Sequence, residues 1–300
     1  MSLADRLVDP KSPDRRPRRA AYALPTLFTA GNVYLGFYSL LKVFEGSMAM
    51  TSATTAGGAH LHFQAAALAI GLAFVLDGLD GRIARMTNTV SDFGREMDSL
   101  ADVITFGIAP GVLAFAWGVF FVDPNSGPAV DPRVFQYLRQ GGYLCAFLFL
   151  ICGALRLARF NIQKNPVPKN PGRSDRKYFV GLPIPAGAAL VASMVYAYGS
   201  APLADWRLAV GWLGLLALLA FLMVSTWRYP SFKDVHLTQA RSPVILILYA
   251  LLIYVTWNFS QVALFAMSVA YVLSGIVIRI GGIVRRRMRP PPPRPEHQIG

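Results

Sequence analysis

The residues best suited to chemistry are four aspartates that flank a short polar connection: Asp77, Asp80, Asp98 and Asp102. The first two are three residues apart and the last two are four apart, so each pair would project from one face of a helix. Apolar stretches adjoin both pairs, and a carboxylate at membrane depth is usually paired, metal-bound or exposed to a wet cavity. Two helices joined through residues 86–91 would bring all four carboxylates to one point.

Bound divalent cations would offset these clustered charges, because uncompensated carboxylates repel one another severely. Oxygen ligands favour hard ions such as Mg²⁺ or Mn²⁺, and no histidine or cysteine lies nearby in the sequence to favour zinc. Three arginines add positive charge: Arg82, Arg85 and Arg95. Small residues leave room for a bulky ligand against the backbone: Gly78, Gly81, Ala84 and Gly94. Metal and arginine together suit a diphosphate, so the pattern indicates a phosphoryl-transfer site.

The elements that must position these side chains are expected to be membrane-spanning helices. Only 15% of the residues are charged and 54% are hydrophobic, with a mean hydropathy of +0.42, whereas soluble domains carry about a quarter charged residues. A crossing needs about 20 apolar residues, which predicts an all-α polytopic protein with about eight transmembrane helices. The expected crossings are residues 22–45, 63–80, 100–122, 141–155, 179–198, 206–227, 242–257 and 259–280.

The basic residues predict how the chain is oriented in the membrane. With both termini in the cytoplasm, the five cytoplasmic segments hold 25 of the 29 Lys and Arg residues. The remaining four are Lys42, Arg133, Arg139 and Arg207. This asymmetry follows the positive-inside rule and places the aspartates at the cytoplasmic face. A net charge of +13 is thereby explained by topology, so no nucleic-acid partner is expected.

Three parts are expected along the chain. Residues 1–21 form a basic cytoplasmic arm, 22–280 a single membrane domain and 281–300 a basic, proline-rich tail. The arm is polar and basic, so it is not a cleavable signal peptide. Whether the arm touches anionic lipid headgroups or is simply a solvated tail stays open at this point.

The aspartates and their neighbours resemble the signature of the CDP-alcohol phosphatidyltransferases. The pattern D-x2-D-G-x2-A-R-x8-G-x3-D-x3-D is matched at every fixed position between Asp77 and Asp102. The resemblance implies six core helices around a polar cavity, a homodimer, and two Mg²⁺ or Mn²⁺ ions that bridge the diphosphate of a CDP-linked lipid. It also implies that Asp77, Asp80 and Asp98 are metal ligands, while Asp102 touches metal and acts as general base. Other motif residues would line the cytidine pocket: Gly81, Ala84, Arg85 and Gly94.

Segments outside the motif are similar to the phosphatidylserine synthase branch of that family. These segments are residues 24–32, 98–110, 153–161, 179–186 and 224–233. The resemblance implies CDP-diacylglycerol and L-serine as substrates, in the cytoplasmic membrane, with Asn32 facing the lipid donor. Arg156 and Arg159, together with Asn161, would pair with the serine carboxylate or a lipid phosphate. Positive-inside anchoring is the alternative for both arginines.

The expected reaction is a transfer in which both substrates are bound together. Asp102 takes the hydroxyl proton, the serine oxygen attacks the phosphorus that bears the diacylglycerol, and CMP leaves. The nearest alternative is the same reaction with another alcohol, namely glycerol 3-phosphate, inositol or its phosphate, or choline. A cation-coupled transporter is the alternative from another class, although no inverted repeat is evident in the sequence.

Overall fold

The structure, a computed structural model, describes residues 19–52, 56–86, 92–123, 131–164, 178–230 and 258–287. Three residues of the predicted site, Asp80, Ala84 and Arg85, belong to a helix, but their side chains lie outside the described part. The predicted crossing at 242–257 also lies outside the described residues.

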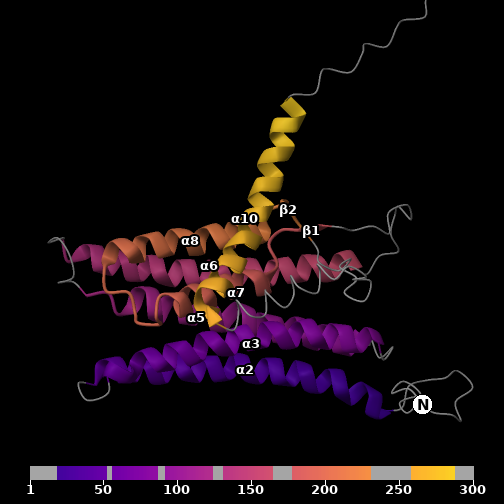
Figure 1. Cartoon of the computed structure of the whole chain (residues 1–300), viewed down its shortest axis with the longest axis horizontal. Coiled ribbons are helices and arrows are strands. Elements are labelled where there is room, and N and C mark those ends of the chain that lie inside the picture. The colour runs from indigo at the N-terminus through magenta and orange to yellow at the C-terminus, as the bar shows by residue number, and fades with distance from the viewer. Residues whose placement is uncertain are drawn as a thin grey trace, which may run out of the picture.

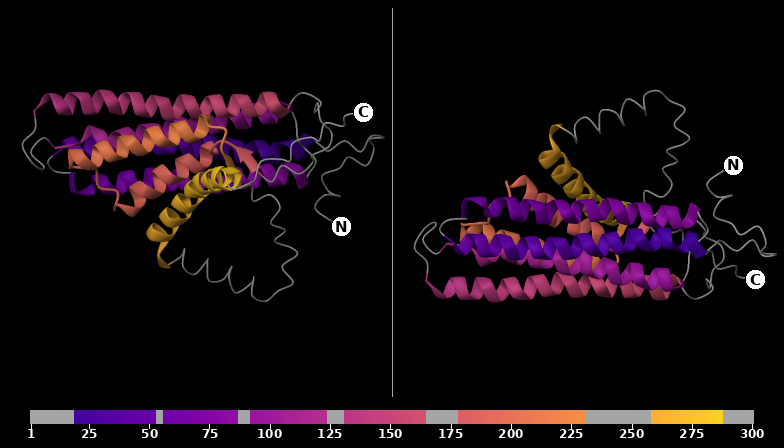
Figure 2. Two further views of the ribbon diagram at one scale, coloured as in Figure 1. Left: turned by 90° about the horizontal axis from the view of Figure 1, so that it is seen from above. Right: turned by 90° about the horizontal axis from the view of Figure 1, so that it is seen from below.

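The described chain is almost entirely helical (Figure 1). In chain order the elements are α2 (Arg19–Thr51), η1 (Ala56–Gly58), α3 (Ala59–Met86), α4 (Asp92–Asp102), η2 (Val103–Ile108), α5 (Ala109–Phe115), η3 (Ala116–Phe120), α6 (Arg133–Lys164), β1 (Tyr178–Val180), α7 (Ile184–Ala197), α8 (Trp206–Val224), β2 (Arg228–Pro230) and α10 (Ser260–Arg287). The long helices α2, α3, α6 and α8 run side by side, whereas α10 crosses the bundle steeply and its C-terminal end projects away (Figures 1 and 2).

Among the described residues, five helices are long and apolar enough to cross a membrane. They are Ala59–Leu79, Phe93–Phe120, Arg133–Ile162, Trp206–Val224 and Ser260–Gly281. Helix α7 is apolar but shorter, and α2, although 33 residues long, is not among the five. A helical membrane protein is therefore confirmed, while eight crossings and cytoplasmic termini stay predictions.

The outward faces of the helices are apolar, as expected for contact with lipid. On α2, large side chains repeat at helical spacing and are exposed: Leu27, Tyr34, Phe37, Leu41, Phe44 and Met48. Inside the bundle, Trp117 and Trp212 pack edge to face with ring centroids 5.2 Å apart, and Trp212 Nε1 donates to the Ala114 carbonyl at 2.9 Å. Such a row of exposed apolar side chains on α2 fits contact with lipid.

Two predicted boundaries were wrong. The crossing expected at 141–155 is part of the much longer α6, a helix of 32 residues. The crossing expected at 179–198 begins as a strand, and its helix starts only at Ile184. Pro183 is extended (φ −58°, ψ 137°), and Pro185 lies in the first turn, where a missing N–H costs no hydrogen bond. The two prolines therefore hold the helix start in place.

Strand β1 pairs antiparallel with β2, so the all-α expectation is wrong for these two short segments. Phe179 lies opposite Tyr229 and Val180 lies opposite Arg228. The ribbon adjoins α10, which contacts β2 (Figure 1). It therefore joins the start of α7 to the segment that follows α8.

The helix that carries Asp98 and Asp102 changes geometry just beyond Asp102. Residues 92–102 are α-helical, and Val103–Ile108 form π-helical turns. Pro110 follows; a proline would clash with the carbonyl four residues earlier in an α-helix, and a wider turn relieves this clash. Helix α2 lies very close to this wide turn, because a Cβ on Gly36 would stand only 2.8 Å from Thr105 Cα.

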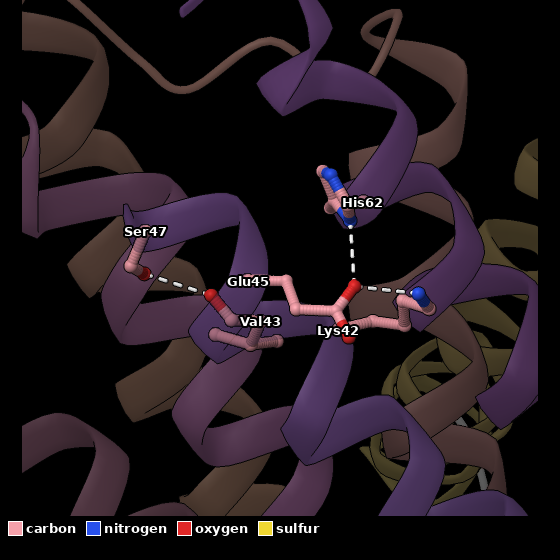
Figure 3. Close-up of polar contacts among 5 residues, drawn as sticks. All are labelled: Lys42, Val43, Glu45, Ser47 and His62. Carbon is pink, nitrogen blue, oxygen red and sulfur yellow. Dashed lines mark hydrogen bonds and ion pairs between the residues drawn. The ribbon is translucent and has the colours of Figure 1, made fainter. Parts of the chain in front are cut away.

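A polar cluster ties α2 to α3 far from the aspartates. The Glu45 carboxylate binds Lys42 at 2.5 Å and His62 Nδ1 at 3.0 Å, and Ser47 Oγ donates to the Val43 carbonyl at 2.8 Å (Figure 3). His62 stands 15 residues before Asp77 on α3, which corresponds to about 22 Å along the helix axis. Of these contacts, the one between Glu45 and His62 joins the two helices, at the end opposite to the aspartates, and the other two lie within α2.

Candidate metal centre

Three of the four predicted carboxylates meet at one point. Asp77 comes from α3, whereas Asp98 and Asp102 lie one turn apart on α4. Each offers an oxygen, and these three oxygens all lie within 4.8 Å of one another. Asp102 is buried, while Asp77 and Asp98 are half-buried. The side chain of Asp80 lies outside the described part, so its place in this group stays a prediction.

The three carboxylates fit a divalent cation. Charges of one sign at this separation repel strongly in a partly buried site, and a cation held between them removes that repulsion. The group consists of oxygen ligands alone, which suits Mg²⁺ or Mn²⁺ and not zinc. The cluster is thus a candidate metal centre, and the particular metal stays a prediction.

Open space adjoins the cluster on α3. A Cβ added to Gly78 or Gly81 would meet no atom of the described residues within 4 Å. A ligand could therefore approach the α3 backbone closely beside Asp77, as the small residues of the motif suggest. Gly94 is exposed on α4, one turn before Asp98. The roles of Gly81, Ala84, Arg85 and Gly94 in a nucleotide pocket stay predictions.

Asn32 presents a buried amide near the cluster. It is fully buried, and neither its side-chain nitrogen nor its side-chain oxygen has a hydrogen-bond partner among the described residues. Its main-chain carbonyl accepts a hydrogen bond from Thr105 Oγ1 at 3.0 Å, which places Asn32 beside the turn that follows Asp102. Leaving a buried polar group unsatisfied costs about 1–3 kcal/mol, so a ligand that binds this amide is favoured.

Arg156 is the buried cation of the site. It is 8% exposed, and within the described part of the chain its Nε has no hydrogen-bond partner. Its charge interacts with the Asp102 carboxylate. A role of Arg156 in binding a negative group of a substrate stays a prediction, which its burial and its charge suit.

Arg159 is engaged differently, because its guanidinium donates to three main-chain carbonyls on two segments. Nη1 donates to the Val224 carbonyl at 3.2 Å, and Nη2 donates to the carbonyls of Val180 and Ser225 at 3.3 and 3.5 Å. These bonds hold β1 and the end of α8 against α6. A role of Arg159 in substrate binding stays a prediction, but its contacts favour a structural role.

Asn161 links the end of α6 to α4. Its Nδ2 donates to Ser99 Oγ at 2.8 Å, and Ser99 directly follows Asp98. The sequence analysis predicted that Asn161 binds the serine carboxylate or a lipid phosphate together with Arg156 and Arg159. The structure places it beside α4 and near one of the three clustered aspartates.

Two tyrosines whose rings pack on each other were missed by the sequence analysis. Tyr229 lies on β2 and Tyr271 on α10, and the charge of Arg156 interacts with Tyr271. The similarity noted for residues 224–233 was a signal for Tyr229. No sequence signal marks Tyr271, because one tyrosine in an apolar helix is ordinary.

Comparison with known proteins agrees with this geometry. The family model of the CDP-alcohol phosphatidyltransferases matches residues 22–223. Two Helicobacter pylori proteins named CDP-diacylglycerol–serine O-phosphatidyltransferase are 38% and 39% identical over 219 residues, which cover 73% of this chain and 76% of each relative. The Bacillus subtilis protein of the same name is 31% identical over 210 residues, 70% of this chain and 91% of the relative.

Proposed function

The chain belongs to the CDP-alcohol phosphatidyltransferase family, and from its relatives we infer that it transfers the phosphatidyl group of CDP-diacylglycerol to the hydroxyl of L-serine and releases CMP. The observation that carries this proposal is the convergence of Asp77, Asp98 and Asp102, which belong to the family signature. The names of the relatives supply the acceptor alcohol.

In the reaction, Asp102 removes the proton from the serine hydroxyl. Asp102 is buried and lies directly before the π-helical turns of η2. Such a position suits a base that must work away from bulk water. The serine oxygen then forms a bond to the phosphorus that bears the diacylglycerol, and the bond from that phosphorus to the CMP oxygen breaks. Divalent cations held by the aspartates would stabilise the charge on the diphosphate. Asp77, Asp80 and Asp98 are proposed as their ligands.

The donor is proposed to lie along α2 and α3. The buried amide of Asn32 supplies hydrogen bonds from α2, and the open space at Gly81 admits the nucleotide close to α3. Ala84, Arg85 and Gly94 complete this pocket by their place in the motif. The lipid tails lie against the apolar outer faces of the helices, and serine enters from the cytoplasmic side. A homodimer in the cytoplasmic membrane is proposed by the same family resemblance.

Serine incorporation into lipid tests the proposed function directly. Purified protein in detergent, given CDP-diacylglycerol and radiolabelled L-serine, is expected to form a chloroform-soluble labelled product and one CMP for each serine transferred. Labelled glycerol 3-phosphate, inositol and choline serve as controls for the acceptor. Efficient use of one of these alcohols, with none of serine, would show that the acceptor has been misassigned.

Substitutions of the two arginines of α6 are expected to have different effects. Arg156→Lys removes the bidentate geometry that suits a carboxylate, so the KM for serine should rise about tenfold or more while the KM for CDP-diacylglycerol changes little. Arg159→Lys loses hydrogen bonds to main-chain carbonyls, so it should lower the melting temperature. It should not change the KM for one substrate more than the KM for the other. Initial rates with each substrate varied, together with thermal melts, separate the two. The assignment is wrong if Arg159→Lys selectively raises the KM for serine and Arg156→Lys does not.

A further inference from the structure

Asn161, near the end of α6, is joined to the helix that carries two of the clustered aspartates. Its Nδ2 donates to Ser99 Oγ at 2.8 Å, and Ser99 Oγ in turn donates to the Arg95 carbonyl at 3.0 Å. A serine hydroxyl can donate one hydrogen bond while it accepts another, so both bonds can exist together. Helix α6 is therefore tied to α4 through the side chain that directly follows Asp98.

Asn161 and Arg159 face different sides of α6. Side chains two residues apart on an α-helix point about 200° apart, because each residue turns the helix by about 100°. The contacts agree with this geometry, since Arg159 donates to carbonyls of β1 and of the end of α8, whereas Asn161 donates to α4. Asn161 is thus turned toward the helix of the metal centre.

Ser99 lies close to the carboxylate face of α4. Asp98 and Asp102 are four residues apart and share that face, and Ser99 lies three residues before Asp102. Oxygens of both aspartates lie within 4.8 Å of an oxygen of Asp77 on α3. Helices α3 and α6 end at the same end of the bundle (Figure 1). Helix α4 therefore meets α3 through its carboxylates and α6 through Ser99.

A metal centre that is shared by two helices depends on how firmly those helices are held. Three carboxylates this close repel one another when no cation lies between them, and the repulsion acts to separate α4 from α3. Mg²⁺ in particular requires oxygen ligands close to their ideal positions. A hydrogen bond from α6 limits the movement of α4, so the ligands lose less freedom when a cation binds.

We propose that Asn161 is a positioning residue of the metal centre, which acts through Ser99 to hold the aspartates of α4 in reach of the cation. In this role neither residue touches the metal or the substrates. Ser99 is not a fixed position of the family signature, and Asn161 lies outside that signature. The inference rests on the proposed function, in which the clustered carboxylates bind a divalent cation, and it replaces acceptor binding as the role of Asn161.

Binding of Mn²⁺ in the absence of substrates tests this role directly. Free Mn²⁺ is followed by its electron paramagnetic resonance signal while purified protein in detergent is titrated. Asn161→Ala and Ser99→Ala should each raise the Kd for Mn²⁺ about three- to tenfold, the range expected for loss of one hydrogen bond. The double variant should bind no more weakly than either single variant, because both substitutions remove the same bond.

The KM for serine separates positioning from acceptor binding. At saturating Mn²⁺, both single variants should have the serine KM of the wild type, because neither residue contacts serine in the proposed role. If Asn161→Ala raises this KM and Ser99→Ala does not, Asn161 binds the acceptor and the inference is wrong.

Ser260→Ala is the matched control. Ser260 Oγ lies 3.1 Å from Tyr196 Oη, so this variant also removes a hydrogen bond between two helices, here α10 and α7. It should leave the Kd for Mn²⁺ unchanged. The inference is overturned if Ser260→Ala weakens Mn²⁺ binding equally, or if Asn161→Ala and Ser99→Ala do not weaken it.

Failure of the proposed function would give a different result. Wild-type protein that binds Mn²⁺ but transfers the phosphatidyl group to another alcohol would overturn the proposed acceptor and leave the role of Asn161 standing. Wild-type protein that does not bind Mn²⁺ would overturn the metal centre, and this inference with it.

Discussion

Removal of divalent cations should reduce phosphatidyl transfer to serine by on the order of a thousandfold or more, since metal stabilisation of transition-state charge contributes several kcal/mol. The physical reason is the cluster itself, in which oxygens of Asp77, Asp98 and Asp102 lie within 4.8 Å of one another. Without a cation, these three negative charges would repel the diphosphate of the donor. The measurement is the initial rate after treatment with EDTA and dialysis.

Addition of metal distinguishes this effect from damage to the protein. Mg²⁺ or Mn²⁺ should restore the rate, and each should raise the melting temperature of the dialysed protein, because a ligand that binds only the folded state stabilises it. Zn²⁺ should restore less, because the described cluster offers only carboxylate oxygens. Full turnover in metal-free buffer would refute a metal centre.

Asp102→Asn and Asp77→Asn should impair different steps, the first the chemical step and the second the binding of metal and donor. Asparagine at 102 keeps an oxygen that can coordinate a metal ion, but this oxygen cannot act as a base. The single-turnover rate should therefore fall about 10²–10⁴-fold, while CDP-diacylglycerol still binds. Asparagine at 77 removes a ligand charge, so the affinities for metal and donor should weaken together. Donor affinity and single-turnover rate, both measured across a metal titration, separate the two variants.

Asp205→Asn is a suitable control for these substitutions. Asp205 caps α8 by accepting a hydrogen bond from the Arg207 main-chain nitrogen at 2.8 Å, and asparagine caps helices about equally well. This variant should keep both donor affinity and rate. If excess metal returns Asp102→Asn to nearly the wild-type rate, Asp102 is only a ligand, and another group deprotonates serine.

The sequence alone predicted the features that depend on local spacing. Helical periodicity put Asp98 and Asp102 on one face, and the short connection after α3 brought Asp77 to them. Apolar composition predicted a helical membrane protein, and five described helices are long and apolar enough to span a bilayer. The signature also predicted the family, which the comparisons confirm. All of these features follow from residues close together in the chain.

The boundaries of several elements could not be predicted from hydropathy. Residues 179–180 are apolar and fit a crossing, but Pro183 and Pro185 delay the helix, and β1 pairs with a strand some 50 residues later. Strand pairing of this kind depends on which segments meet in space. A hydropathy pattern records only how apolar a segment is.

The roles of similar side chains were separated only by the tertiary structure. Arg156 and Arg159 share a helix and a residue type, yet one is buried near Asp102 and the other binds carbonyls of β1 and of the end of α8. Tyr271 lies 42 residues after Tyr229, and their rings pack with centroids 5.8 Å apart only because α10 crosses back beside the β1–β2 ribbon. Spacing along a helix determines which side chains share a face, whereas the crossing of helices determines what that face meets.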